Sequence, residues 1–434
     1  MQSQSNRSLY LGGAVSAIIT CAFLFLFPIL TQYFEYKITD LKYSFRSMLD
    51  EEPSMNPSVV MVNLDDYSKI QSGKPLWPYE YYADVIDKIS SGNPTSIGID
   101  IILTNTIDTS GWSLVLSAME NSFLAINPYM VKFGDKDELI DIASHDDILS
   151  ELSMDDLPQG KQGDIKHVVD IIYKSRQDIM NSSAGIGFIN IIPDMDGVLR
   201  RLPIVAEING MLTPHFTLRL LCEHLEYNLS NMELVNNRKL ILHDFPVGGH
   251  KKDIEIPLDG QGNMLINYIS FEKVKRSIKS RSFGSVSAWD LKNSRTIDLS
   301  DKTVLFGDNS SAAKDISTTP IDGVLQSPLV FAMAISNILE ETFIKTIFPQ
   351  STLTLLIILL LCLFFIASKV DAFQFGLISF SILWLYVLCN FIVFIYLGLQ
   401  MQVLTIFIPL FITSAYMLIF MVYQSQVTMG VLEG

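Results

Sequence analysis

Five aspartates that follow or interrupt predicted β-strands are the residues of this sequence best suited to chemistry. They are Asp65, Asp66, Asp100, Asp308 and Asp315. Carboxylate oxygens are the ligands that calcium and magnesium prefer, so such a group could hold a divalent cation or a cationic ligand. Aspartate is equally suited to helix N-termini and turns, where its side chain accepts backbone N–H groups. Both interpretations stay open: a ligand-binding cluster, with any metal unknown, and a set of structural caps.

No other motif gives a firmer assignment. Asp194, Asp196 and Gly197 resemble the start of an EF-hand loop, but the later acidic residue, Glu207, falls in a predicted strand, so we expect a turn. The sequence has no P-loop, no H-E-x-x-H zinc helix, no nucleophile elbow and no kinase motif set. Its six histidines show no ligand spacing, and only one of its four cysteines lies outside the hydrophobic segments. We expect no catalytic residue and no cofactor in this chain.

The elements that position the first aspartates follow from hydrophobic patterns. An apolar run over 58–64 precedes Asp65, helical periodicity covers 79–89, and a second apolar run over 95–103 contains Asp100. Strand, helix and strand in this order predict a βαβ unit whose two strands are adjacent and parallel. The carboxyl edge of such a sheet is where ligands usually bind.

Further elements complete a mixed α/β domain with a partly parallel sheet flanked by helices. They are a short helix over 139–152, strands over 185–192, 198–208 and 302–306, and a helix over 324–343. The strands on either side of the Asp194 turn are expected to form a hairpin.

The charged residues are confined almost entirely to one large segment. The chain of 434 residues is 49% hydrophobic with a formal charge of −15, which argues against a wholly soluble chain, a disordered chain and a nucleic-acid-binding surface. Outside 35–345 the only charged residues are Arg7, Lys369, Asp371 and Glu433. The uncharged stretches reach the length of about 20 apolar residues that a membrane helix needs. We predict transmembrane helices over 9–31, 348–367, 374–396 and 403–423.

An apolar heptad pattern follows the first span. Its members, spaced 4, 3, 4 and 3 residues apart, are Phe34, Ile38, Leu41, Phe45 and Met48. This spacing predicts one face of a helix that continues out of the bilayer. The face could pack against the core of the large domain. Alternatively, it could form a dimer stalk that couples the domain to the membrane.

Basic residues near the spans do not decide on which side of the membrane the large domain lies. Those on its side are Lys37, Lys42, Arg46 and Lys345, against Arg7 and Lys369 on the other. The positive-inside rule therefore leans toward a cytoplasmic domain, but long domains follow this rule poorly.

Short motifs occur in a distinctive order along the polar domain. They are Asp40–Arg46 (DLKYSFR), Val62–Asp66 (VNLDD), Leu76–Pro78 (LWP), Gly98–Ile102 (GIDII), Asp194–Pro203 (DMDGVLRRLP), Leu265–Tyr268 (LINY), Phe283, Val286–Ala288 (VSA), Val304–Gly307 (VLFG), Asp315 and Thr319–Pro320 (TP). In this order they resemble the CHASE domain of type 2, a sensor domain of bacterial signalling receptors. The similarity covers about 40–340, with one span before it and three after.

The resemblance implies an extracytoplasmic sensor domain over 34–345 in the bacterial cytoplasmic (inner) membrane. Residues 1–8 and 424–434 would then be cytoplasmic. It also implies a cytoplasmic effector, such as an adenylate or guanylate cyclase, a diguanylate cyclase or a kinase. Because the sequence ends at Gly434, 11 residues after Tyr423, we expect the effector in a longer parent protein or a separate partner.

The expected function is therefore the receptor half of a transmembrane sensor, without enzymatic activity of its own. Its expected partners are the membrane, a second copy in a homodimer, an effector and an unknown stimulus, with no nucleic acid. Two alternatives remain: a metal-dependent periplasmic enzyme anchored to the membrane, and a standalone membrane scaffold.

Overall fold

The chain folds into two compact units. The computed structural model describes residues 2–74, 77–104, 111–122, 124–135, 165–247, 250–294, 297–313, 315–347 and 349–433, and the helix predicted over 139–152 lies outside them. We call Met1–Glu51 with Ile344–Gly434 the membrane unit, and Glu52–Phe343 the α/β unit.

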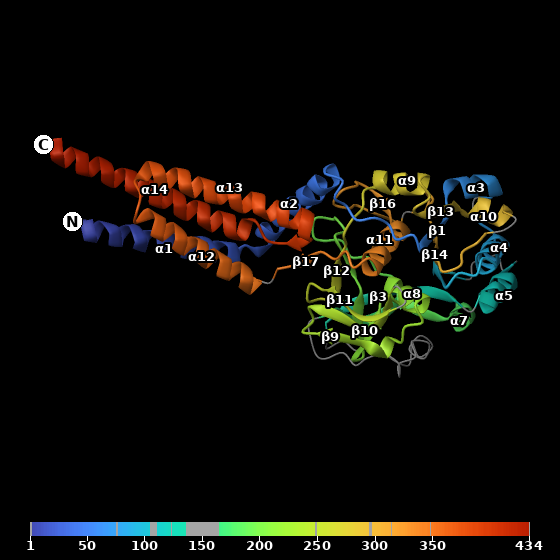
Figure 1. Cartoon of the computed structure of the whole chain (residues 1–434). Helices are drawn as coiled ribbons and strands as arrows, with labels where there is room; N and C mark the ends of the chain where they lie inside the picture. The colour runs from blue at the N-terminus through green and yellow to red at the C-terminus, as the bar shows by residue number, and fades with distance from the viewer. Residues whose placement is uncertain are drawn as a thin grey trace. The chain divides into compact units, whose positions relative to one another are not determined.

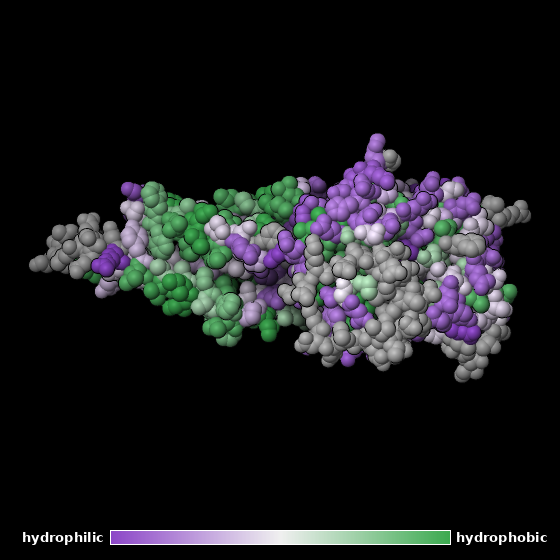
Figure 2. Space-filling view, turned by 90° about the horizontal axis from the view of Figure 1, so that it is seen from below, coloured by the Kyte–Doolittle hydropathy of each residue, from purple (hydrophilic) through white to green (hydrophobic). Residues whose placement is uncertain are grey.

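The membrane unit contains four helices that are long and apolar enough to cross a membrane. They are α1 (Gln2–Leu26), α12 (Pro349–Ala367), α13 (Ala372–Leu397) and α14 (Leu404–Glu433). They pack side by side around buried residues such as Leu9, Leu363, Leu383 and Leu410 (Figure 1). Figure 2 shows hydrophobic side chains gathered over their outer surface. One N-terminal and three C-terminal membrane helices, as the sequence predicted, are confirmed.

A separate helix, α2 (Pro28–Met48), follows α1, whereas the sequence predicted one continuous helix. Phe27 leaves the helical conformation, with φ −120° and ψ 56°, and Pro28 starts the new helix. The physical reason is that proline has no N–H to donate and its ring clashes with the preceding turn. Two short strands, β17 (Lys345–Thr346) and β18 (Leu399–Gln400), pair in parallel within the same unit.

The α/β unit is built on a mixed sheet that has nine strands among the described residues. Along the sheet they are β13 (Gly284–Ser287), β1 (Val59–Leu64), β14 (Thr303–Asp308), β2 (Ser96–Asp100), β3 (Ala125–Gly134), β4 (His167–Lys174), β7 (Val205–Ile208) and β8 (Met211–Pro214), with β5 (Gly185–Phe188) also on β3. The strands from β13 to β3 pair in parallel, whereas β4 is antiparallel to β3 and β8 to β7. The partly parallel sheet is thus confirmed.

The prediction that the first two strands are neighbours is wrong, because β14 lies between β1 and β2. Strands that follow each other in sequence are often neighbours, but a later strand that buries both faces can insert between them. Helices α4 (Tyr79–Ser90), α5 (Trp112–Ser122) and α10 (Ala288–Asn293) belong to the core on one side of β1, β14 and β2. Helices α8 (Phe216–His224) and α11 (Ser327–Leu339) also contact these strands. Burial on both faces explains the continuous apolar runs of these strands.

The hairpin predicted around Asp194 is also wrong, although its turn is confirmed. Gly197 donates its N–H to the carbonyl of Asp194 at 2.9 Å and has φ +79°, a conformation that suits glycine. The flanking strands do not pair with each other: β5 joins β3, and β6 (Arg201–Pro203) joins β12 (Asn263–Leu265). A turn is fixed locally, whereas burial elsewhere in the fold selects the strand partner.

The remaining elements are small. They are α3 (Asp66–Ser72), α7 (Gln177–Asn181), α9 (Phe271–Lys279), the 3-10 helix η2 (Leu229–Asn231), and strands β9 (Met232–Val235), β10 (Lys239–Val247), β11 (His250–Pro257), β15 (Ile316–Ser317) and β16 (Leu325–Gln326). The predicted helix over 324–343 corresponds to the shorter α11.

Candidate functional site

The sheet register brings the predicted aspartates to one edge. Leu64 of β1 lies beside Asp308 of β14, and Gly307 lies beside Asp100 of β2. Asp65 directly follows β1, so three parallel strands end in carboxylates at the same level. This is the edge where open α/β sheets usually bind ligands.

Two of the aspartates accept backbone N–H groups at the sheet edge. Asp65 is the N-cap of α3: its Oδ1 accepts the backbone N–H of Ser68 at 2.8 Å, and it also accepts the Ser287 hydroxyl at 2.9 Å. Asp66 accepts the backbone N–H and the hydroxyl of Ser311 at 2.9 and 3.0 Å. The capping interpretation therefore describes Asp65, whereas Asp66 binds a loop residue that is 245 positions away in the chain.

Asp308 and Asp315 also have partners within the protein. Asp308 forms an ion pair of 2.8 Å with Lys69 through Oδ2, while its Oδ1 accepts the N–H and hydroxyl of Ser310 at 3.0 and 2.6 Å. Asp315 accepts the hydroxyl of Ser327, the first residue of α11, at 2.6 Å. Both side chains therefore fasten loops that leave the sheet edge.

Asp100 differs from the other four. Its Oδ2 atom is buried and has no hydrogen-bond partner among the described residues. Burial raises the pKa of Asp100 well above its ordinary value, and the nearby charges of Asp315 and Asp308 raise this pKa further. A carboxyl group with a strongly raised pKa at a sheet edge is a candidate for function, although structural clusters produce the same signature.

The donor set at this edge does not favour a cation. Over the part of the chain that the structure describes, no group of three or more His, Cys, Asp or Glu side chains is arranged to hold a metal ion. Lys69 places a positive charge beside Asp308, where it competes with any cation. Ligand binding by the five aspartates therefore stays a prediction, and the metal-dependent enzyme gains no support from this arrangement.

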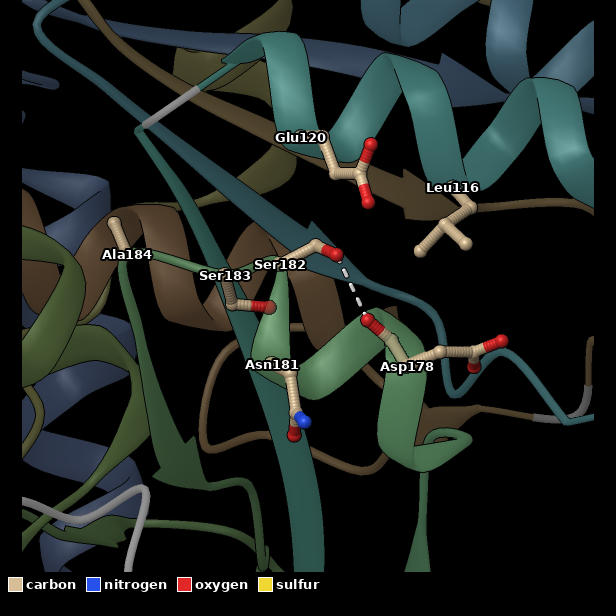
Figure 3. Close-up of a pocket in the computed structure, with 7 residues that line it drawn as sticks. All are labelled: Leu116, Glu120, Asp178, Asn181, Ser182, Ser183 and Ala184. Atoms are coloured by element: carbon tan, nitrogen blue, oxygen red, sulfur yellow. Dashed lines mark hydrogen bonds between the residues drawn. The ribbon is translucent and has the colours of Figure 1, made fainter.

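A shallow pocket lies away from this edge, between α5 and α7 (Figure 3). Its volume is about 540 Å³, and its lining residues are Leu116, Glu120, Asp178, Asn181, Ser182, Ser183 and Ala184. Most of its polar groups already have partners: Asp178 accepts the indole N–H of Trp112 at 3.0 Å, and Ser182 donates to the Asp178 carbonyl at 2.8 Å. These contacts leave few groups available to select a ligand.

The heptad face predicted to couple the domain to the membrane lies on α2 and is largely exposed. Phe34, Leu41, Phe45 and Met48 each keep between 46% and 78% of their surface, and Ile38 packs against the core of the membrane unit. The face is therefore not absorbed into the core of the α/β unit. Whether it binds a second copy stays a prediction.

The adjoining polar face of α2 is the part of the molecule that sequence analysis missed. Glu35, Thr39, Lys42 and Arg46 recur at spacings of 4, 3 and 4 residues and are all buried. Polar residues repeating at helical spacing next to a span were the available signal, because charges that leave water need partners.

A second missed cluster lies in the Asp194 turn. The Arg200 side chain is fully buried, and its guanidinium contacts Asp196 twice at 2.9 Å and Asp194 once at 3.0 Å. The DMDGVLRR motif thus encodes a turn that carries its own internal counter-charge. We regard this cluster as structural, since its carboxylates already bind arginine.

These features define a membrane protein with one large mixed α/β domain inserted between its first and second membrane helices. A family model described as the CHASE2 domain matches residues 15–367, well over half of the chain. The chain belongs to the CHASE2 family, a family of extracytoplasmic sensor domains. Comparisons with curated proteins and with solved structures gave no match.

Proposed function

We propose that this chain is the receptor half of a transmembrane signalling protein of the bacterial inner membrane. The α/β unit senses a stimulus outside the cytoplasm, and the membrane helices carry the change to a cytoplasmic effector. The effector class best suited to this family is a class III adenylate or guanylate cyclase. The chain itself contributes sensing and transmission, not catalysis.

One observation supports the proposal most strongly: the family match encloses a domain whose two ends both continue into membrane helices. A stimulus that shifts the domain between two arrangements would act on both connections at once. A domain connected to the membrane at only one end could move without displacing the membrane helices.

The exposed face of α2 supports a homodimer as the working form. Its apolar residues follow heptad spacing, which is the pattern by which two helices pack together. Ile38 packs within the same chain, whereas the other four heptad residues keep about half or more of their surface exposed, where a second copy could cover them.

The orientation is tested by cysteine labelling of the full chain in bacterial spheroplasts. The two variants are Ser230→Cys, exposed in the α/β unit, and Ser368→Cys, exposed between α12 and α13. A membrane-impermeant maleimide should label the Ser230→Cys variant in intact spheroplasts and the Ser368→Cys variant only after lysis. The reverse result would contradict an extracytoplasmic domain.

Signal transmission is tested by joining a class III cyclase catalytic domain after Gly434. Cyclic nucleotide production is followed while pH, osmolarity and divalent cations are varied outside the membrane. The fusion should respond to at least one condition to which the catalytic domain alone is indifferent. A fusion that follows the catalytic domain alone under every condition, including with small periplasmic solutes, would contradict coupling.

A further inference from the structure

The short segment between α13 and α14 contacts both stretches of chain that connect the membrane unit to the α/β unit. We call Gly398–Val403 the junction segment. The first stretch is α2, which precedes the α/β unit in sequence, and the second is β17, which follows it. The junction segment, α2 and β17 all belong to the membrane unit.

Glu35 of α2 caps the start of α14. Its carboxylate accepts the backbone N–H groups of Val403 at 2.9 Å, Leu404 at 2.6 Å and Thr405 at 3.3 Å. The first N–H groups of a helix have no partner within it, and the helix dipole favours a negative charge there. The cap of α14 is therefore supplied by another helix. The start of α14 cannot shift relative to α2 without breaking these hydrogen bonds.

Lys42, two turns further along α2, holds the middle of the junction segment. Its ammonium group donates to the Gln400 side-chain oxygen at 3.2 Å and to the Met401 carbonyl at 2.9 Å. Gln400 in turn donates to the Thr39 hydroxyl at 2.8 Å. Lys42 is fully buried, and this burial lowers its pKa to about 8, while the charge of Glu35 opposes the decrease.

Strand β17 and the residue after it bind the junction segment through backbone hydrogen bonds. Lys345 donates its N–H to the Gly398 carbonyl at 2.7 Å, and Ile347 donates to the Gln400 carbonyl at 2.9 Å. Gln400 is thus shared: its side chain contacts α2, and its backbone contacts the chain that leaves the α/β unit.

Such contacts respond to displacement in a discrete way. Buried charged groups are costly to leave without partners, so the contacts break or re-form as a set instead of stretching gradually. Gly398 ends α13 in the left-handed conformation, with φ +62°, which fixes how the segment leaves that helix. The junction segment is therefore expected to move together with α2 and β17, which contact it.

We infer that the junction segment is the point at which movements of the two connections are combined and passed to α14, with Glu35, Lys42 and Gln400 as its positioning residues. The inference rests on the proposed sensor function but names the place of transmission. Because the junction segment contacts both α2 and β17, its position depends on the displacement of one relative to the other. Neither connection alone determines this relative displacement.

The test uses the full chain in lipid nanodiscs, with its four native cysteines replaced by alanine. Nitroxide labels are attached at Ser8→Cys and Ser425→Cys, near the other ends of α1 and α14. Electron paramagnetic resonance gives the distance between the labels, and hydrogen exchange gives the protection of the Leu404 N–H. Neither measurement needs the natural stimulus, so it remains interpretable even if the cyclase fusion never responds.

Three substitutions break the junction at separate points: Glu35→Gln, Lys42→Met and Gln400→Met. Each should move the label distance distribution by about 1–2 Å, the scale of helix shifts in allosteric transitions. Glu35→Gln should also speed exchange of the Leu404 N–H by about tenfold, because a charged acceptor is lost. Lys42→Met combined with Gln400→Met should shift the distance by less than the sum of the two single shifts, since either change alone removes the bond between Lys42 and Gln400.

Matched controls change the same residue types outside the junction. Glu51→Gln and Lys369→Met are exposed positions of the membrane unit and should leave both measurements unchanged. If Glu35→Gln speeds exchange but none of the three variants moves the label distance, the contacts are only a local cap and the inference is wrong. Should Lys42→Met fail to fold, Glu35→Gln, which keeps the side-chain shape, decides the question.

Discussion

Replacing Arg200 with methionine should destabilise the α/β unit more than any neighbouring charge change. The guanidinium is fully buried and makes three hydrogen bonds of 2.9 to 3.0 Å to Asp194 and Asp196, whose side chains are 10% and 2% exposed. Methionine fills much of the volume but leaves two nearly buried carboxylates without this partner. Breaking a buried ion pair from one side costs about 3–5 kcal/mol, out of roughly 5–15 kcal/mol for a whole domain.

The loss should appear as a fall of about 10 °C in the midpoint of thermal unfolding, given roughly 2–4 °C per kcal/mol for a domain of 150–250 residues. Tryptophan fluorescence is the assay of choice, since Trp77, Trp112 and Trp289 lie in the α/β unit. The full chain in nanodiscs should be heated at neutral pH.

Arg201→Met is the matched control, because Arg201 also pairs with Asp194 but its side chain is 27% exposed. Exposed ion pairs contribute up to about 1 kcal/mol, so this variant should shift the midpoint only slightly. Adding Asp194→Asn and Asp196→Asn to Arg200→Met should recover most of the loss, since no buried charge is left unpaired and the partly exposed Arg201 keeps Asp259. If the two arginine variants behave alike, the argument from buried charge is refuted.

Three further predictions concern other groups of the α/β unit. Asp65→Ala should lower its unfolding free energy by about 1 kcal/mol in urea titrations, because α3 loses its N-cap, while Asp65→Ser should retain the cap and most of the stability. Burial lowers the pKa of His215 to about 3, so the unfolded chain binds one more proton between pH 3 and 6.5 and stability falls as the medium is acidified through this range. His215→Asn should remove roughly 2 kcal/mol of that loss between pH 6.5 and 5. If urea titrations show that the unfolding free energies of the two proteins fall equally over this pH range, the assignment to His215 is contradicted. Cys222 is fully buried with a pKa raised to about 12, so maleimide should label it only in urea; labelling of the folded chain at the rate of a Ser230→Cys thiol would show that the core opens.

The candidate site shows where sequence reasoning reached its limit. Strand ends marked by Asp65, Asp100 and Asp308 were predicted from apolar runs, and the sheet register does bring them to one edge. Their bonding was not predictable, because Ser287 and Lys69 reach these carboxylates only after distant strands and helices have packed. Chemistry that depends on a free carboxylate is decided by such partners, not by residue type.

For the fold, too, features set by local interactions could be predicted from the sequence, and features set by long-range packing could not. The membrane helices, the buried strands and the Asp194 turn were predictable, since uncharged length, apolar runs and turn residues act within a few residues. The insertion of β14 between β1 and β2 was not, because it depends on which surfaces fit when the whole domain is assembled.

The sequence by itself determined that a polar domain is inserted between membrane helices, and the order of its motifs indicated the CHASE2 family. Only the tertiary structure decided which face of α2 is buried and what its charges bind. Glu35 and Lys42 are separated from their partners at 400–405 by more than 350 positions of chain, so no local pattern could reveal the pairing. Charges enter a nonpolar environment only when folding supplies their counterparts, and that supply is a property of the assembled molecule.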